Sequence, residues 1–429
     1  MLPAGASLAD WLTWLETLSP KEIDLGLERV QSVLGRLELA LPRHVLLIAG
    51  TNGKGSSVAL LQALLNASAY RVGAYTSPHV IRYNERIAVE GVPASDEAIV
   101  SAFEKVEAVR HDVPLTYFEY GTLAAMVVFA SSNLDAWVLE VGMGGRLDAT
   151  NAIDPSASLI TNISLDHCDW LGNDIEAIAF EKAGVMRAGV PTVVGSRRVP
   201  RSLLQHAEST GTELILAGRD FDFERDGNGG WNWQGRATSR TTLPLPGLDG
   251  DFQVENAAAV LALIEAAGLD EALDPAILEH ELPKLTLAGR MQDMRAGGVD
   301  WLLDVAHNVA AAEVLAETLD ATRVDGDTWA IVGLLDDKDV EGIAVALDGQ
   351  VDHWIAVTAE SARALQADEL ARRVANACGR PCRIGESLET AMQYAQRNAS
   401  DNDRILLTGS FYLVGPALSI LKLYSRPRT

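Results

Sequence analysis

The chain has 429 residues, enough for two domains or more. Its formal net charge of −24 argues against a nucleic-acid-binding protein, since such proteins neutralise phosphates with an excess of Lys and Arg. No apolar stretch approaches the ~20 residues of a membrane-spanning helix, and the start of the chain lacks the basic region of a signal peptide. The three cysteines offer neither a disulfide framework nor a zinc spacing. We therefore expect a cytoplasmic globular protein that binds neither nucleic acid nor membrane.

The stretch from His44 to Ser57 has the arrangement of a phosphate-binding loop. Apolar residues 45–48 predict a buried strand, and a helix is expected from Val58, after a glycine-rich turn. Glycines let backbone amides point at a phosphate, and the helix N-terminus adds partial positive charge. Lys54 can reach the terminal phosphates, while a hydroxyl after it can hold Mg²⁺. The alternative, a glycine-rich turn with a chance lysine, is disfavoured because strand and helix lie where the motif needs them. The candidate loop residues are Gly50, Thr51, Asn52, Gly53, Lys54, Gly55, Ser56 and Ser57.

Polar side chains follow three of the predicted strands. Ser77 follows the strand after the loop's helix, Glu140 lies near the end of the next strand, and His167 lies just beyond a third. We expect these side chains to converge, because ligands of open α/β sheets bind at the carboxyl ends of strands. Oxygen and nitrogen atoms of this kind can hold a divalent cation. Lys182, on the next predicted helix, looks from its position like an ordinary surface charge.

Tyr117 and Phe118 lie among polar residues near the start of a predicted helix. Such rings either fill the core or form a wall for a planar ligand, and from position alone the core is favoured. The glycine-rich turn at residues 142–151 carries charged side chains and looks like part of a site. Arg82 and Arg86 fit a solvated surface and an anion-guiding role equally well.

The remaining pattern predicts two α/β domains. Helices are expected within residues 7–41, strands at 191–195 and 213–217, short antiparallel strands on the edge of the same sheet at 219–243, and a helix at 254–264. After residue 288 a second strand–helix alternation begins, with its first strand at residues 299–303. We therefore place the domains at residues 1–288 and 289–429.

Several motifs occur together in a characteristic order: AGTNGKGS, TSPH, LTYFEYGTL, LEVGMGGRLDATN, DHCDWLG, FEKAG, ENAAA, AGR and DVAHN. In this order they resemble the bacterial bifunctional folylpolyglutamate synthase/dihydrofolate synthase family of the Mur ligase superfamily. The resemblance implies an ATP-binding P-loop domain with a mostly parallel sheet, like the central domain of Mur ligases, at residues 1–288. It implies a smaller, Rossmann-like α/β glutamate-ligase domain at residues 289–429.

The resemblance also implies ATP-dependent amide formation. ATP phosphorylates a carboxylate of the pterin substrate, and the amino group of L-glutamate attacks the acyl phosphate. The implied partners are ATP, L-glutamate, dihydropteroate and reduced folates, with a monomeric enzyme. Two Mg²⁺ ions are implied, the first at Ser56 and Glu140, and Ser77 is implied as a further metal ligand. The second maps to His167 and to Lys182 as a carbamate, which would give this lysine the ligand character of a carboxylate. The implied catalytic residues are Lys54, Lys182 and His167.

Further contacts follow from the same resemblance. Besides the loop, the nucleotide contacts map to Asn256, Arg290 and Asp304. The dihydropteroate pocket maps to Thr116, Tyr117, Phe118, Glu119, Leu147, Asp148 and Ala149, which reverses the core interpretation of the two rings. His307 maps to the second domain's side of the substrate cleft. Two positions depart from the family pattern: Val309 replaces a common proline and is expected to loosen a helix start, and Val305 replaces a small residue, which is expected to shift Asp304 and His307.

Other functions remain open on the sequence. A single-function folylpolyglutamate synthase would share all these motifs. A Mur-type amino-acid ligase would carry an N-terminal domain for a UDP-sugar, but few residues precede the first strand. A P-loop kinase or NTPase that makes no amide bond leaves the DHCDWLG and DVAHN motifs unexplained, and a non-catalytic nucleotide-binding module needs no metal-binding residues at several strand ends.

Overall fold

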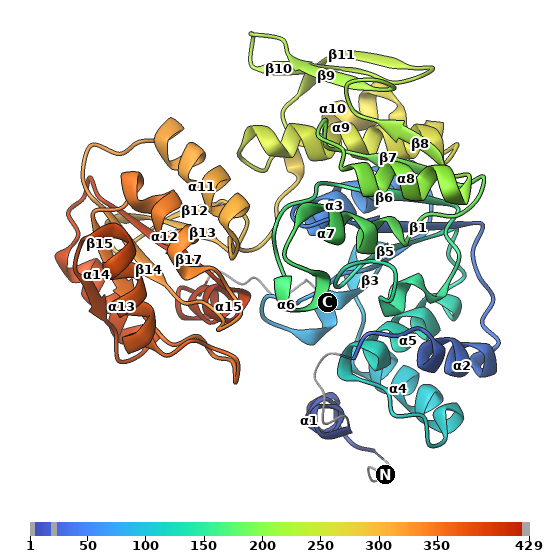
Figure 1. The fold of residues 1–429 in the computed structure, drawn as a ribbon, viewed down its shortest axis with the longest axis horizontal. Helices are drawn as coiled ribbons and strands as arrows, with labels where there is room; N and C mark the ends of the chain where they lie inside the picture. Colours follow the sequence, from blue (N-terminus) through green and yellow to red (C-terminus); the bar gives the residue numbers. More distant parts are fainter. Residues whose placement is uncertain (1–4, 19–23, 423–429) are drawn as a thin grey trace. The chain divides into compact units, whose positions relative to one another are not determined.

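The computed structural model describes residues 5–18 and 24–422. The chain divides into two compact units (Figure 1). The larger unit comprises Met1–Ile163, Asn173–Gly247 and Gln253–Leu285, and the smaller unit comprises Ser164–Gly172, Leu248–Phe252 and Thr286–Thr429. None of the helices described is both long and apolar enough to cross a membrane.

The larger unit is built on an eight-stranded sheet, as predicted for an α/β domain. Its strands are β1 (His44–Ala49), β2 (Val72–Tyr75), β3 (Ile87–Val89), β4 (Val92–Pro93), β5 (Ala136–Glu140), β6 (Ala157–Ile160), β7 (Pro191–Val194) and β8 (Glu213–Leu216). They lie in the order β4-β3-β2-β5-β1-β6-β7-β8. Only the pairings of β3 with β2 and β4 are antiparallel. After β1 the chain forms β2, β3, β4 and β5, which all lie on one side of β1. It then crosses to the other side of β1 and forms β6, β7 and β8. The carboxyl end of β1 therefore lies where the strand order reverses, the usual ligand position in open α/β sheets.

Helices bury the central strand β1. Val45, Leu47 and Ala49 belong to one core cluster, whereas Leu46 and Ile48, which alternate with them, are equally buried. A strand buried on both faces needs a continuous apolar run rather than an alternating one, and residues 45–49 provide it. The helices of this unit are α1 (Leu8–Leu18), α2 (Glu28–Leu37), α3 (Lys54–Ala67), α4 (Asp96–Arg110), α5 (Tyr117–Ala130), α7 (Ile175–Ala183), α8 (Arg201–Thr210), α9 (Asp251–Ala266) and α10 (Pro275–Glu281).

The prediction for residues 219–243 is wrong in one respect. They form antiparallel strands, but in a separate sheet of β9 (Asp222–Arg225), β10 (Gly230–Gln234) and β11 (Ser239–Pro244) rather than on the edge of the large sheet. Trp231 and Trp233 alternate along β10 and are both fully buried. The Trp233 indole N–H donates to the carbonyl oxygen of Ala258 in α9 at 3.1 Å. Burial of these two rings therefore places the sheet against α9 (Figure 1).

The smaller unit contains a six-stranded sheet in the order β12-β13-β17-β14-β15-β16. Its strands are β12 (Gln292–Ala296), β13 (Val299–Asp304), β14 (Thr328–Val332), β15 (His353–Ala356), β16 (Cys382–Ile384) and β17 (Arg404–Thr408). Its helices are α6 (Cys168–Leu171), α11 (Val309–Ala321), α12 (Val340–Leu347), α13 (Ala367–Cys378), α14 (Leu388–Asn398) and α15 (Phe411–Ile420).

The antiparallel edge strand of this sheet, β12, was not among the predicted strands. Its residues, QDMRA, are mostly polar, because an edge strand needs little apolar surface. A two-residue Gly297–Gly298 turn connects it to β13, and both glycines have positive φ. Gly-Gly between two strands is a hairpin signal that the sequence carried.

Candidate functional site

The loop after β1 adopts a conformation that only glycine allows at two positions. Gly50 and Gly53 have φ angles of 141° and 83°. A Cβ on Gly50 would lie 1.9 Å from Thr161 Oγ1, and a Cβ on Gly53 would lie 2.4 Å from Asn256 Oδ1. The loop is thus packed tightly against β6's end and α9. Helix α3 begins at Lys54, earlier than the predicted Val58, so the lysine lies in the first turn beside the positive end of the helix.

Two residues that the sequence analysis did not single out hold this loop. The Thr161 hydroxyl donates to Asn52 O at 2.6 Å, and Asn162 Oδ1 accepts from the Asn52 amide at 3.0 Å. Both side chains directly follow β6, the strand beside β1. Their position, immediately after a strand predicted to be parallel to β1, was the sequence signal that could have identified them as loop contacts.

Two lysines approach the same carbonyl group of the loop. Lys54 Nζ donates to the carbonyl oxygens of Gly50 and Thr51, both at 3.1 Å. Lys182 Nζ donates to Gly50 O at 2.9 Å. The interpretation of Lys182 as an ordinary surface charge is wrong, because only 4% of the residue is exposed. The Lys54 ammonium places a positive charge beside the loop, which favours an anion there although the whole chain is acidic.

The residues Ser56, Ser77 and Glu140, predicted as metal ligands, lie close together within the larger unit. Parallel pairing of β1 and β5 sets Glu140 beside Ile48, next to the loop. Glu140 Oε2 accepts from the Ser77 amide at 3.1 Å, and a Cβ on Gly55 would lie 3.9 Å from the same oxygen. The buried Ser56 hydroxyl is one residue further on. Mg²⁺ is commonly bound by one or two carboxylates plus hydroxyls, phosphate oxygens and water, and this oxygen set fits it. No group of three or more His, Cys, Asp or Glu side chains that could hold a metal occurs in residues 5–18 and 24–422.

Helix α9 contacts the phosphate loop at Gly53 and Ser56. Asn256, a predicted nucleotide contact, lies against Gly53 and donates through Nδ2 to Gln253 Oε1 at 3.2 Å. Gln253 Nε2 in turn approaches Ser56 Oγ at 3.5 Å. Gln253 was not among the predicted site residues, although its spacing of three residues from Asn256 places both amides on one face of the helix.

The two predicted pocket segments also meet. A Cβ on Gly142 would lie 2.5 Å from Phe118 Cζ, so the turn after β5 touches the first turn of α5. Tyr117 and Phe118 are half-buried, with their rings against the core. Asp148 holds the 142–151 turn together, since its carboxylate accepts from the Met143 amide at 2.9 Å and from the Thr150 hydroxyl at 2.6 Å. Burial nevertheless raises the pKa of Asp148. The flanking Leu147 is half-buried and Ala149 is buried.

Arg82 and Arg86, which the sequence did not distinguish, differ in burial. Arg82 is exposed, with its NH2 nitrogen 3.6 Å from an Asp96 oxygen. Arg86 is buried and donates through Nε to His79 Nδ1 at 2.9 Å. Burial and the neighbouring guanidinium lower the pKa of His79 to about 4, so this imidazole is neutral at pH 7 with its proton on Nε2. The Arg86 guanidinium also lies 5.7 Å from the ring centre of Tyr117.

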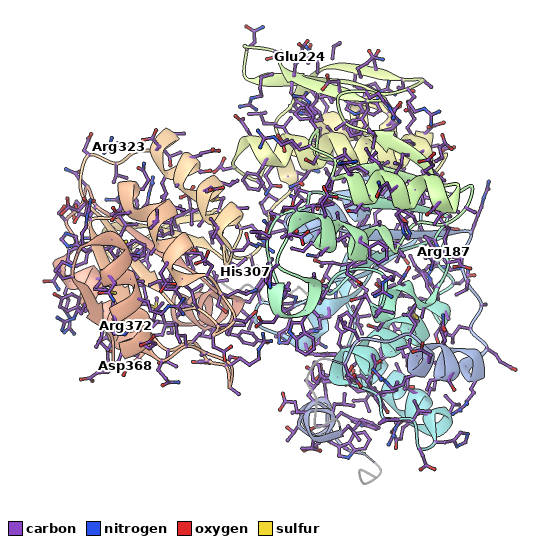
Figure 2. All side chains as sticks on the ribbon, viewed as in Figure 1. Arg187, Glu224, His307, Arg323, Asp368 and Arg372 are labelled. Carbon is purple, nitrogen blue, oxygen red and sulfur yellow. The ribbon has the colours of Figure 1, made fainter. Side chains whose placement is uncertain are left out.

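In the smaller unit, two predicted site residues lie at the carboxyl end of β13: Asp304 is its last residue, and His307 follows it. Asp304 is buried, and its carboxylate accepts from the Met291 amide at 2.9 Å and the Ala306 amide at 2.8 Å. Burial raises the pKa of Asp304, and Arg290 opposes that rise. His307, labelled in Figure 2, donates through Nδ1 to Val305 O at 2.7 Å.

The expectation that Val309 loosens the helix start is wrong. Helix α11 begins at Val309 itself, and the side chain of Asn308 caps it by accepting from the Ala311 amide at 2.9 Å. A proline would preset the backbone of this first position, but the asparagine cap satisfies an amide there.

The smaller unit also contains a buried polar cluster that the sequence analysis did not assemble. Asp166 accepts from Lys338 Nζ at 2.7 Å and from Asn308 Nδ2 at 2.9 Å, and His307 Nε2 lies 3.6 Å from it. Burial by itself raises the pKa of Asp166, but the charges of His307, His167 and Lys338 together hold it below its usual range. Burial also disfavours the charged form of His307, which lowers the pKa of this imidazole to about 4. The charged residues that follow β14 in the sequence were the signal for Lys338.

The predicted position of His167, just beyond a strand, is wrong. Strand β6 ends at Ile160, and Ser164–Gly172 belongs to the smaller unit. His167 has a φ of 51°, and its Nε2 lies 3.9 Å from Asp166 Oδ2. Within its own unit, His167 is therefore part of the Asp166 cluster.

Comparison with known proteins identifies the family. The Mur ligase middle domain matches residues 48–264, and the Mur ligase glutamate ligase domain matches residues 289–411. The dihydrofolate synthase/folylpolyglutamate synthase of Escherichia coli K12 is 38% identical over 419 residues, covering 97% of this chain and 96% of the relative. The chain belongs to the dihydrofolate synthase/folylpolyglutamate synthase family of Mur ligases.

Solved structures of this family agree over the whole fold. E. coli FolC in complex with DHPP and ADP has a TM-score of 0.90 at 36% identity, covering 99% of each chain. A bifunctional folylpolyglutamate synthase/dihydrofolate synthase with Mn, AMPPNP and L-glutamate bound has a TM-score of 0.89 at 39% identity, covering 98% of this chain and 99% of that one. The dihydrofolate synthase/folylpolyglutamate synthase family consists of ATP-dependent ligases, so a kinase without amide formation and a non-catalytic module are excluded.

Proposed function

We propose that this protein joins L-glutamate to dihydropteroate and to reduced folates at the expense of ATP. The observation that carries the proposal is the end of β5. Glu140 is its last residue and faces the phosphate loop, while Gly142, two residues later, packs on the ring of Phe118. One strand end therefore adjoins both the place for ATP phosphates and the place for a planar ring. A pterin held there would extend its carboxylate toward the phosphates.

The chemistry takes two displacement steps. A carboxylate oxygen of the pterin substrate attacks the γ-phosphorus of ATP, the bond to the β-phosphate oxygen breaks, and ADP leaves. The amine of L-glutamate then attacks the acyl carbon, loses a proton, and expels inorganic phosphate as the amide forms. Phosphoryl transfer requires positioning and charge neutralisation more than covalent help from the protein. Lys54, the loop amides and the positive end of α3 supply both at the phosphates.

Ser56, Ser77 and Glu140 are the residues that would hold the first Mg²⁺. When bound, the ion neutralises charge on the β- and γ-phosphate oxygens. A second ion would be held by His167 and by Lys182 as a carbamate, as the resemblance implies. The burial of Lys182 beside Gly50 O supports a role at the phosphate loop rather than at the surface.

The remaining predicted residues take binding roles in this proposal. Asn256, Arg290 and Asp304 contact the nucleotide, and His307 contacts the substrates. Residues 1–288 would bind ATP, residues 289–429 would act in glutamate ligation, and the enzyme would work as a cytoplasmic monomer. Relatives that carry both activities in their names support bifunctionality.

The test is ATP turnover by the purified protein with dihydropteroate or tetrahydrofolate, each with and without L-glutamate. We expect both pterin substrates to release phosphate in step with amide product, and only when glutamate is present. Turnover with tetrahydrofolate alone would identify a single-function folylpolyglutamate synthase. Phosphate release that ignores glutamate would overturn the ligase assignment.

A further inference from the structure

The helix that precedes the first strand is tied to the start of α5 by an ion pair. Arg29, in the first turn of α2, donates to Glu119 Oε1 through NH2 at 2.9 Å and through Nε at 3.2 Å. Only 5% of the Glu119 side chain and 23% of the Arg29 side chain are exposed. The same guanidinium pairs with Asp24 at 2.9 Å and donates to its carbonyl oxygen, which anchors it from the other side. Two guanidinium nitrogens donate to one carboxylate in this mostly buried pair, so the pair fixes the relative orientation of the two side chains as well as attracting them.

The other oxygen of Glu119 completes a helix cap. Glu119 Oε2 accepts from the Thr116 amide at 2.7 Å, and Thr116 Oγ1 accepts from the Glu119 amide at 3.2 Å. This reciprocal cap determines where α5 begins. Both carboxylate oxygens of Glu119 are therefore occupied by the protein itself.

The helix turn between these two residues carries the aromatic side of the pocket. Phe118 packs on Gly142, as described above, and Tyr117 lies edge-on to Tyr83 with ring centres 6.0 Å apart. A movement of this turn would move both rings, because the helix cap and the ion pair hold the backbone that carries Tyr117 and Phe118.

We propose that Arg29 is a positioning residue for the pterin-binding wall. Through Glu119 it holds the first turn of α5 so that Phe118 and Tyr117 face the substrate. This inference rests on the proposed function and deepens it, because it assigns part of the pterin site to a helix that precedes the first strand. It also changes the role of Glu119 from a substrate contact to a support.

The chain offers a matched control on the same helix. Arg36 lies two turns after Arg29 and donates to the carbonyl oxygens of Val109 and Arg110 at 2.9 and 3.1 Å. These two hydrogen bonds anchor α2 to the end of α4. Loss of Arg36 therefore loosens α2 in general, whereas loss of Arg29 loosens the pocket wall.

The experiment compares three variants with the wild type: Arg29→Lys, the double variant Arg29→Met/Glu119→Gln, and Arg36→Met. Arg29→Lys keeps the positive charge but loses the second nitrogen donor to Glu119. The double variant leaves no buried charge unpaired, so it stays measurable if Arg29→Met alone fails to fold. For each we would measure KM and kcat for dihydropteroate, KM for ATP, and the midpoint of thermal unfolding.

We expect KM for dihydropteroate to rise about tenfold in the double variant and about threefold in Arg29→Lys, with KM for ATP within about twofold of wild type. Arg36→Met should change neither KM, whatever it does to thermal unfolding. Equal changes in both KM values, or a KM for dihydropteroate that stays at the wild-type value, would overturn the positioning role. If the wild type itself does not use dihydropteroate or tetrahydrofolate, the proposed function fails instead, and the two failures are thereby distinguished.

Discussion

The phosphate loop of the larger unit and the Asp166 cluster of the smaller unit are built in opposite ways. The loop is one continuous stretch between a strand and a helix, and its glycine and lysine positions are visible as a pattern. The cluster joins Asp166, the His307–Asn308 pair and Lys338, which come from three distant segments. The difference shows that a site made of backbone geometry can be recognised locally, whereas a site made of side-chain charges exists only after folding.

The largest expected effect lies in the loop. Lys54→Ala should lower kcat by about a thousandfold or more, because a positive charge is lost where transition-state charge develops. Thermal unfolding should change little, since the side chain contacts carbonyl oxygens of its own loop. The measurement is steady-state phosphate release, with Lys284→Ala as the control for removal of a half-exposed lysine. Turnover near the wild-type level would contradict the role of Lys54.

The cluster should show a large effect on stability. Asp166→Asn removes the carboxylate that lies 2.7 Å from the buried Lys338 ammonium and leaves only the more distant Asp337 carboxylate at 3.4 Å. It should lower the free energy of unfolding by about 3 kcal/mol. The double variant Asp166→Asn/Lys338→Met should recover much of that loss, because no unpaired charge remains. Urea unfolding of the full chain measures both. If the loss in the double variant equals the sum of the losses in Asp166→Asn and in Lys338→Met measured alone, the pair is not coupled and the comparison fails.

The smaller unit should also lose stability at acidic pH through His307. Its folded pKa of about 4 lies below the ordinary value of 6.5, so the unfolded chain takes up this proton first as pH falls. The free energy of unfolding therefore falls progressively from about pH 6.5 down to pH 4. The upper limit of this loss is about 3 kcal/mol. The expected loss is smaller than this limit, because 24% of the side chain is exposed to solvent, which screens the charge. Unfolding of wild type and His307→Gln across this range tests it, and the variant should show a flatter pH dependence. Parallel curves would exclude His307 as the cause.

The smallest effect is expected where α9 supports the loop. Gln253→Leu removes the amide that approaches Ser56 Oγ at 3.5 Å and that accepts from Asn256. We expect the Mg²⁺ concentration for half-maximal activity, and the dissociation constant for ATP measured by calorimetry, to rise about threefold to tenfold. A change in the KM for dihydropteroate alone would contradict this assignment.

The sequence by itself determined the α/β class, the parallel sheet, the phosphate loop and the family. Each of these depends on short-range rules: apolar runs predict buried strands, and glycines mark backbone angles that other residues avoid. The family followed from the order of several such motifs. For Tyr117 and Phe118 the pattern favoured the core and the resemblance implied the pocket, and their assignment to the pocket stays a prediction.

Only the tertiary structure decided which charges meet. It buried Lys182 beside Gly50, paired Arg29 with Glu119, and brought Lys338 to Asp166. It also placed the tryptophans of β10 against α9 in a separate sheet. The physical reason is the same in each case. A charged or aromatic side chain has no preferred partner along the chain, and its neighbour is determined by strand order and helix packing, which bring distant residues within a few ångströms.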